Sequence, residues 1–239
     1  REACDFYAYI GLPIDFADEL TEEDAAPLPR NEESDWHVQD QSTGVAVDTD
    51  WSKPKEKLLA SAIAFTHQGQ ELAAAFRFAD ARRLLQSALE IRERLLGMDH
   101  PDTAETCQDI ASVCQDEGDY DRALEWYDRA LEIVKNTLGE GSSRAATLYN
   151  NIATVLQSQG HLASALTLFQ KAQAVYESSL GAEHPETADV YSNLGMLYYD
   201  LGDYGQAHQW CAKALDVYEK MPEPDELDIA NVDNNIALL

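Results

Sequence analysis

Positive charge is scarce in this sequence, and so are several other features on which common functions depend. The 239 residues include 17 Lys and Arg against 44 Asp and Glu, which gives a formal net charge of −27. Nucleic acids and anionic lipid surfaces are bound through clustered Lys and Arg, so this balance argues against both as main ligands. No apolar run approaches the ~18 residues of a membrane-spanning helix. The sequence therefore predicts no nucleic-acid partner and no transmembrane segment.

Cysteine and reactive motifs are also scarce. Four Cys residues in 239 are too few for a disulfide framework. Cys107 and Cys114 would lie ~10 Å apart on one helix, beyond the ~7 Å reach of a disulfide, and Cys211 falls at a core position. The chain has no Gly-rich phosphate loop, nucleophile elbow or His-Glu-x-x-His segment. The sequence predicts no catalytic residue, no metal site and no cofactor.

The first 50 residues differ in composition from the rest. They carry 14 acidic side chains against Arg1 and Arg30, a net charge of −12, and three Pro residues. They show no sustained period of 2 or 3.6, whereas the whole chain is 45% apolar and can form a substantial core. We expect an extended acidic arm over residues 1–53. Because the chain begins with Arg, we expect an upstream segment such as a transit peptide to have been removed, or the chain to have been shortened.

Large apolar side chains are nevertheless concentrated in this arm. Such a segment either packs on the chain's own helices, docks on another subunit or stays mobile. The candidates for docking are Phe6, Tyr7, Tyr9, Ile10, Phe16 and Trp36. Trp51, just before the repeats, is a further candidate for a short contact.

A period of 42 residues organises the remainder of the chain. Gly118, Gly160 and Gly202 have this spacing. Two rows of alanine follow it as well: Ala81, Ala123, Ala165 and Ala207, and Ala88, Ala130, Ala172 and Ala214. Several registers with one period indicate a repeat protein.

Each repeat is predicted to contain two helices. In one unit the first helix runs from about Thr187 to Leu201 and stops at Gly202, because glycine readily adopts the left-handed conformation that ends a helix. The second runs from about Tyr204 to Glu219. A helix with a single apolar stripe cannot bury it alone, so the helix pairs must stack.

The motif inside the repeat separates tetratricopeptide units from HEAT or armadillo units, which have similar periods. Residues 191–198 read Tyr-x2-Leu-Gly-x2-Tyr and are followed by Ala207 and Ala214, a pattern that resembles the tetratricopeptide signature. Residues 96–104 and 180–188, both Leu-Gly-x2-His-Pro-x-Thr-Ala, resemble the linker of the kinesin-light-chain subtype. The Asn-Asn-Ile-Ala segments at 150–153 and 234–237 resemble its Asn-Asn-Leu-Ala run.

This resemblance implies an all-α fold, a right-handed α-solenoid of helix-turn-helix repeats over residues 54–239. We place the repeats at about 55–97, 98–139, 140–181 and 182–223, with a half-repeat at 224–239. The first repeat is degenerate and suits a cap. The half-repeat is either a solvating end helix or the start of a further unit. No heptad region accompanies the repeats, which argues against a motor light chain.

The resemblance also implies that five positions of each first helix line the concave side. They are Glu105, Gln108, Ser112, Gln115 and Asp116; Thr147, Asn150, Thr154, Gln157 and Ser158; Asp189, Ser192, Met196, Tyr199 and Asp200; and Asn231 and Asn234 in the half-repeat. The spans 102–116, 145–158 and 187–200 contain six acids and no Lys or Arg. Uncompensated acids disfavour an acidic ligand, so we expect neutral or basic peptide segments to be preferred. The alternative is that the acids only keep the solenoid soluble.

Together these features predict a non-catalytic scaffold for protein–protein interactions, as a structural or assembly subunit of a larger complex. The alternative is a peptide-binding adaptor that recruits cargo or clients. We expect a soluble intracellular protein, either cytoplasmic or in an organelle after removal of a transit peptide.

Overall fold

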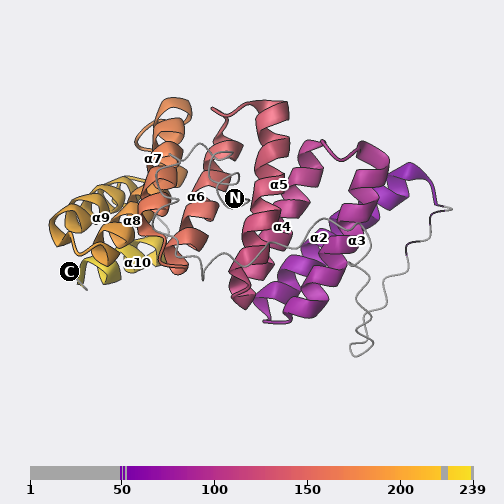
Figure 1. Cartoon of the computed structure of the whole chain (residues 1–239), viewed down its shortest axis with the longest axis horizontal. Coiled ribbons are helices and arrows are strands. Elements are labelled where there is room, and N and C mark those ends of the chain that lie inside the picture. Colours follow the sequence, from indigo (N-terminus) through magenta and orange to yellow (C-terminus); the bar gives the residue numbers. More distant parts are fainter. Residues whose placement is uncertain (1–48, 50, 52, 222–225, 238–239) are drawn as a thin grey trace, which may run out of the picture. The chain divides into compact units, whose positions relative to one another are not determined.

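A computed structural model of the chain describes residues 49, 51, 53–221 and 226–237, and within them it contains nine helices and no strand (Figure 1). The helices are α2 (Lys55–Ala74), α3 (Phe78–Leu96), α4 (Pro101–Glu117), α5 (Tyr120–Leu138), α6 (Ser143–Ser158), α7 (Leu162–Ser179), α8 (Pro185–Asp200), α9 (Tyr204–Glu219) and α10 (Glu226–Ala237). The predicted all-α repeat fold is confirmed. The six arm candidates, from Phe6 to Trp36, lie outside the described residues, so their role stays a prediction.

The helices pack as consecutive pairs, α2 with α3, α4 with α5, α6 with α7 and α8 with α9. The second helix of each pair also contacts the first helix of the next pair, and α10 packs on α9. Figure 1 shows this succession in chain order. Each pair buries its apolar stripe against its own partner and its neighbours, as expected of a solenoid.

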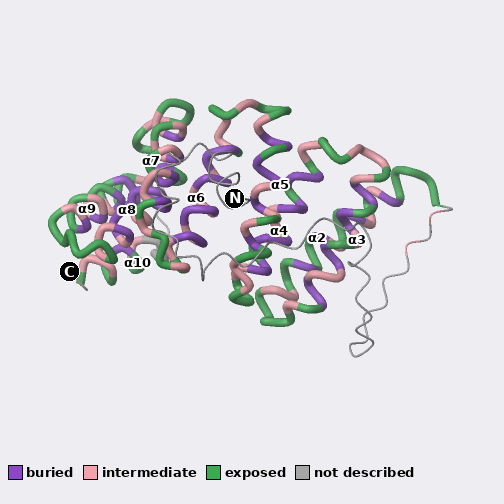
Figure 2. Tube along the Cα trace, viewed as in Figure 1, coloured by how far each residue is buried: buried purple, intermediate pink, exposed green. Residues whose placement is uncertain are grey.

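Small residues line the contact between the two helices of a pair. Ala165 and Ala207 are fully buried on the second helices. Gly195 of α8 approaches α9 so closely that an added Cβ would clash with Cys211 Sγ and lie 3.3 Å from the carbonyl oxygen of Ala207. In Figure 2 the buried residues form stripes along the helices rather than whole turns. The two helices of this pair therefore meet at close range beside Ala207.

The turn within each pair requires a left-handed residue. Gly118, Gly160 and Gly202 have φ values of +83°, +83° and +77°. The equivalent residue of the first pair is Phe76, which adopts φ +58° and is 82% exposed. A bulky residue in this conformation is strained, whereas glycine is not. The helix before Gly202 spans Pro185–Asp200, so it begins two residues earlier than predicted.

The earlier start follows from the turn that joins successive pairs. His184 Nδ1 accepts a hydrogen bond from the backbone N–H of Glu186 at 3.2 Å, which caps the new helix, and Pro185 occupies its first position. Thr187 Oγ1 donates to the carbonyl oxygen of Gly181 at 2.8 Å. The His-Pro segment therefore stabilises the turn and caps the helix that follows it.

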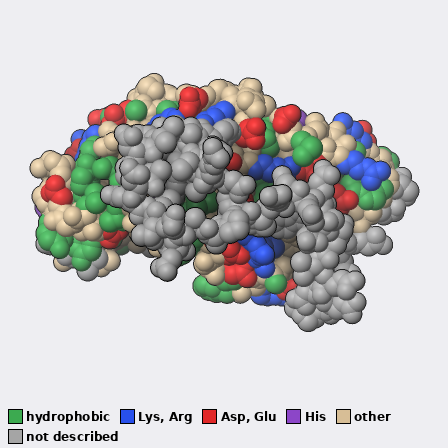
Figure 3. All heavy atoms as spheres, in the orientation of Figure 1, with side chains coloured by type: hydrophobic (Ala, Val, Ile, Leu, Met, Phe, Trp, Pro, Cys, Tyr) green, Lys and Arg blue, Asp and Glu red, His purple; other side chains and the backbone are tan. Residues whose placement is uncertain are grey.

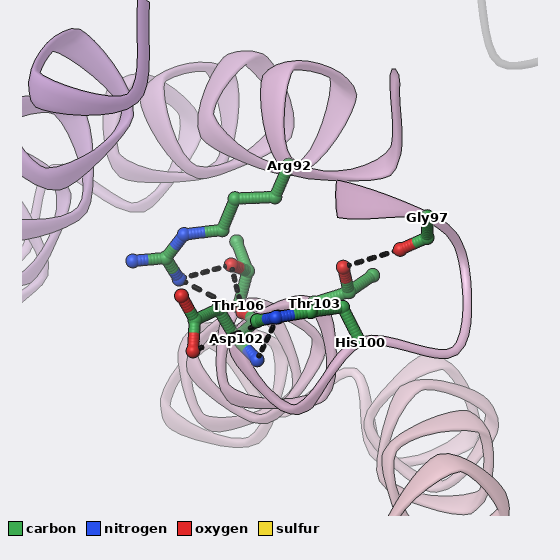
Figure 4. Close-up of polar contacts among 6 residues, drawn as sticks. All are labelled: Arg92, Gly97, His100, Asp102, Thr103 and Thr106. Atoms are coloured by element: carbon green, nitrogen blue, oxygen red, sulfur yellow. Dashed lines mark hydrogen bonds and ion pairs between the residues drawn. The ribbon is translucent and has the colours of Figure 1, made fainter. Parts of the chain in front are cut away.

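The same turn precedes α4, where an arginine joins it (Figure 4). His100 Nδ1 accepts from Asp102 N–H at 3.1 Å, and Thr103 Oγ1 donates to Gly97 O at 2.9 Å. Arg92 of α3 is only 7% exposed and donates to Asp102 O at 2.9 Å. It also donates to the hydroxyl of Thr106. A buried guanidinium thus ties the first pair to the second.

Two later junctions share a different polar arrangement. Tyr191 Oη donates to Glu177 Oε1 at 2.6 Å, and Lys213 Nζ lies 3.2 Å from the same oxygen and 3.8 Å from the Tyr191 ring centre. One repeat earlier, Tyr149 donates to Glu140 at 3.0 Å while Lys171 Nζ lies 2.6 Å from that carboxylate. Both sets combine an ion pair with a cation–π contact. The Glu177 set joins the third pair to the fourth, and the Glu140 set ties the turn before α6 to the third pair.

The bases of the second helices are largely engaged within the solenoid. Arg82 pairs with Glu117 at 2.6 Å, and Arg129 pairs with Glu93. On the face shown in Figure 3, Lys and Arg side chains are accordingly interspersed with Asp and Glu.

Candidate functional site

The predicted concave positions form a continuous series of accessible side chains, which we call the first-helix face. None of them is buried. The exposed members are Glu105, Ser112, Asp116, Ser158, Asp189, Asp200, Asn231 and Asn234. The half-buried members are Gln108, Gln115, Thr147, Asn150, Thr154, Gln157, Ser192, Met196 and Tyr199. Accessibility is a requirement for contact, but binding by these residues stays a prediction.

Amide side chains connect neighbouring first helices across this face. Asn193 Nδ2 of α8 donates to Asn150 Oδ1 of α6 at 2.9 Å. Gln157 Nε2 donates to Asp200 Oδ2 at 2.6 Å, again from α6 to α8. The structure therefore brings the third and fourth repeats together at two polar positions, and part of their hydrogen-bonding capacity is used internally.

Second-helix tyrosines hold three further positions. Tyr127 Oη donates to Gln115 Oε1 at 3.1 Å, and Tyr218 donates to Asp189. Tyr176 Oη and Thr147 Oγ1 are 2.7 Å apart. These bonds fix side chains at the edge of the first-helix face, so the face presents ordered polar groups.

The first repeat also contributes to the face, which sequence reasoning missed. Gln70 of α2 is 42 residues before Ser112, and its Nε2 donates to Asp109 Oδ1 at 3.1 Å. Ile63 is 42 residues before Glu105 and is 64% exposed. Extending the 42-residue register into the degenerate first repeat would have found both residues.

Asp109 follows the face residue Gln108 in α4, and its carboxyl has a perturbed pKa. Burial raises the pKa of its carboxyl to about 6, the Gln70 hydrogen bond and the charge of Arg92 lower it by less, and the charge of Glu105 raises it. Its Oδ2 atom is buried without a hydrogen-bond partner. Partial desolvation by neighbouring side chains also raises the pKa of Asp116, although this residue is exposed. Asp109 therefore carries a negative charge only at a cost in free energy.

An apolar patch adjoins the acidic end of the face in α8 and α9. The rings of Tyr199 and Tyr204 are 5.6 Å apart, and Tyr204 is 54% exposed. Leu201, between them, is 43% exposed. The sequence identified Tyr199 but not Tyr204 or Leu201, because both belong to the turn and the next helix rather than to the first-helix register.

The thiols are not part of the face. Cys107, Cys114 and Cys211 are buried, and burial raises the pKa of Cys107 to about 12. A thiol with a raised pKa is a poor nucleophile. In the described part of the chain, no group of three or more His, Cys, Asp or Glu side chains is arranged to hold a metal ion. No helix among the described residues is long and apolar enough to cross a membrane.

Comparison with known proteins agrees with this architecture. The sequence model of the tetratricopeptide repeat matches residues 61–136 and 143–220. A solved structure of BtubC (BKLC) from P. vanneervenii is similar with a TM-score of 0.57 and 22% identity, covering 78% of this chain and 83% of that one. A putative kinesin light chain from Podosopora anserina, with nearly identical TPR-like repeats, has a TM-score of 0.62 at 17% identity, covering 78% and 86%. A single-residue variant of that protein has the same TM-score at 16% identity, with the same coverage. No curated protein matches the chain.

Proposed function

Because the chain belongs to the tetratricopeptide repeat family, we propose that it is a non-catalytic scaffold that holds protein subunits together through its first-helix face. Repeats of this family bind other proteins. We further propose that this face binds neutral or basic segments of partner proteins. The protein would then be a structural or assembly subunit of a larger complex.

One observation carries the charge preference. The charged side chains of the face are all acids, whereas bases of the second helices such as Arg82, Arg129 and Lys213 pair with acids of neighbouring helices. An acidic ligand on the face would therefore meet several carboxylates, whereas α4, α6 and α8 carry a single Lys or Arg side chain, that of Arg144 at the start of α6. A basic segment would gain from Asp189 and Asp200, and its apolar side chains would find the Tyr199–Tyr204 patch.

Titration calorimetry with matched peptides tests this preference. We expect a basic peptide to bind more tightly than an acidic peptide of equal length and apolar content, and added salt to weaken the basic peptide. Replacing Asp189 and Asp200 by Asn keeps an oxygen acceptor on each side chain and removes two negative charges. The ratio of the two peptides' dissociation constants should therefore become several-fold smaller.

The matched control removes two acids from the second helices instead, as Glu90→Gln with Glu132→Gln. Both of these residues are exposed. This control should leave the ratio of the two peptides' dissociation constants nearly unchanged. Tighter binding of the acidic peptide would contradict the proposal. An equal effect of the two double variants would show that only net charge matters.

Purification separates the scaffold from the alternative, a transient adaptor. A scaffold subunit should co-purify with its complex in fixed stoichiometry and survive high salt. Loss of all partners at high salt would favour the adaptor.

A further inference from the structure

Side-chain hydrogen bonds join neighbouring first helices at two of the junctions between repeats. Between the first and second repeats, Gln70 of α2 donates to Asp109 of α4 at 3.1 Å. Between the third and fourth repeats, Asn193 of α8 donates to Asn150 of α6 at 2.9 Å. Among residues 53–221, no side-chain hydrogen bond joins α4 to α6 across the junction of the second and third repeats. The helices follow the same division, because α2 contacts α4 and α6 contacts α8, whereas α4 and α6 make no comparable contact.

The amides that could close this open junction are nevertheless in place. Gln108 of α4 is 42 residues before Asn150, and Asn151 of α6 is 42 residues before Asn193. Both are therefore in register with the two side chains that bond one repeat later. Both are half-buried, and neither side chain takes part in a hydrogen bond within the described part of the chain. The junction thus holds two amide groups with unused donors and acceptors.

A second pair of equivalent residues also stays apart. Gln157 donates to Asp200 between the third and fourth repeats, and the residues 42 positions earlier are Gln115 and Ser158. Gln115 Oε1 instead accepts from Tyr127 within its own repeat at 3.1 Å, which leaves its Nε2 group as a donor. Ser158 Oγ donates to a backbone oxygen of its own helix at 3.0 Å. The junction is therefore open at two levels along α4.

Partly buried amides with unused capacity suit the backbone of an extended segment. An amide side chain offers a donor and an acceptor, which complement the C=O and N–H of a backbone. Gln108 and Gln115 are seven residues apart in α4, or ~10 Å along the helix, which is the length of about three extended residues. We propose that the open junction between α4 and α6 binds an extended segment of a partner protein through hydrogen bonds from Gln108, Gln115 and Asn151 to its backbone.

The charges around the junction select the segment. Glu105 and Asp116 of α4 are exposed at the two ends of this row, and α4 has no Lys or Arg. Arg144, at the start of α6, is far from the Asp116 end, so a Lys or Arg of the partner is favoured at that end. Residues 1–50 carry a net charge of −12 and a second copy carries −27, so both are disfavoured as occupants. This inference deepens the proposed function and rests on it.

Two double-mutant cycles test whether the junction is open in the free chain. Urea denaturation gives the free energy of unfolding for Gln108→Ala, for Asn151→Ala and for the double variant. We expect the two losses to be additive, because these amides do not bond to each other. The bonded pair Asn150 and Asn193 is the matched comparison and should show a coupling. A coupling of Gln108 with Asn151 as large as that of this pair would show a closed junction and overturn the inference.

Binding is tested with octapeptides that are selected from a random display library on the 239-residue chain and then synthesised. In fluorescence anisotropy, Gln108→Ala with Asn151→Ala should weaken the selected peptides roughly tenfold, because hydrogen bonds to the ligand backbone are lost. Methylation of single backbone nitrogens in the peptide should weaken binding at two positions about three residues apart. Gln86→Ala with Gln170→Ala, which removes exposed amides from the second helices, is the matched control and should change nothing.

Failure of this inference differs from failure of the proposed function. Peptides whose binding depends on Asp189 and Asp200 but not on Gln108 and Asn151 would overturn the inference alone. Binding that depends on neither pair, or a library without any binder, would contradict both. Self-association of the chain that Gln108→Ala with Asn151→Ala abolishes would overturn the choice of another protein and make a second copy the occupant.

Discussion

Gly195 sets the separation between α8 and α9. An added Cβ would clash with Cys211 Sγ, and both residues are buried. We expect Gly195→Ala to lower the free energy of unfolding by about 1–3 kcal/mol, because the packed helices must shift to admit the methyl group. Urea denaturation followed by circular dichroism measures the change.

The double variant Gly195→Ala with Cys211→Ala is the control, because it removes the sulfur that the new methyl would strike. It should recover much of the loss relative to Cys211→Ala alone. If the two substitutions are simply additive, the helices do not meet at this point and the register is wrong.

The buried carboxyl of Asp109 makes the stability of the fold depend on pH. Burial raises the pKa of its carboxyl from 3.8 to about 6, so the folded state favours the protonated form. The folded state therefore has its full stability below the unfolded pKa of 3.8, where the Asp109 carboxyl is protonated in both states. The free energy of unfolding then falls as pH rises from there through about 6, because the buried carboxyl must ionise. Asp109→Asn should therefore gain stability relative to the parent between pH 4 and pH 7, by about 1–3 kcal/mol.

The Asn side chain retains an acceptor for Gln70, whose bond to Asp109 is 3.1 Å long. Urea denaturation at four pH values measures the difference between variant and parent. The exposed turn residue Asp99 supplies the control, because Asp99→Asn removes a carboxylate that is not buried. A constant difference for Asp109→Asn would contradict the burial argument.

At the scale of helices, the cap at His184 is expected to control the start of α8. Its Nδ1 satisfies the Glu186 N–H, which the helix itself cannot pair. We expect His184→Ala to cost about 0.5–2 kcal/mol in thermal or urea unfolding. His184→Asn should retain most of the stability, since Asn also offers a side-chain acceptor.

Ser142 shows that the function of the cap does not require histidine. Its Oγ accepts from Ala145 N–H at 3.3 Å in the equivalent turn before α6. His208, exposed on α9, provides the comparison, and His208→Ala should be nearly neutral. Equal losses at His184 and His208 would show that the cap is energetically unimportant.

The helices and their pairing could largely be predicted from the sequence, because they follow its 42-residue period. The 42-residue spacing identified the helix pairs, and the predicted bounds of α9, Tyr204 to Glu219, agree with the structure. Accessible first-helix positions also follow from the register. The Asn150–Asn193 bond could not be predicted, because it depends on the rotation of one pair against the next. The left-handed conformation of Phe76 could not be predicted either, because bulky residues rarely adopt a positive φ.

At the scale of the whole molecule, the arm and the solenoid should be separable. The described core begins near Trp51, which packs on the cluster around Leu58 and lies 4.1 Å from the Arg94 guanidinium. We expect deletion of residues 1–50 to leave the melting temperature within a few degrees of the parent's, because this core remains. We also expect it to weaken partner co-purification, because it removes Phe6 and Tyr7.

Deletion of residues 1–52 is the matched control, since it also removes Trp51. It should cost a further ~1–3 kcal/mol through loss of apolar burial. A chain without residues 1–50 that fails to fold would place the arm in the core. A folded chain with unchanged assembly would make the arm a passive tail.

The succession of helix pairs has a mechanical consequence. Because packing links each pair mainly to its neighbours, a pulling force on the described solenoid acts on one junction after another rather than on a single shared core. The junction between the third and fourth pairs is held by the Tyr191, Glu177 and Lys213 contacts, whereas the first pair contains the strained turn at Phe76. Under load we expect the first pair to yield first and the third and fourth pairs to extend last.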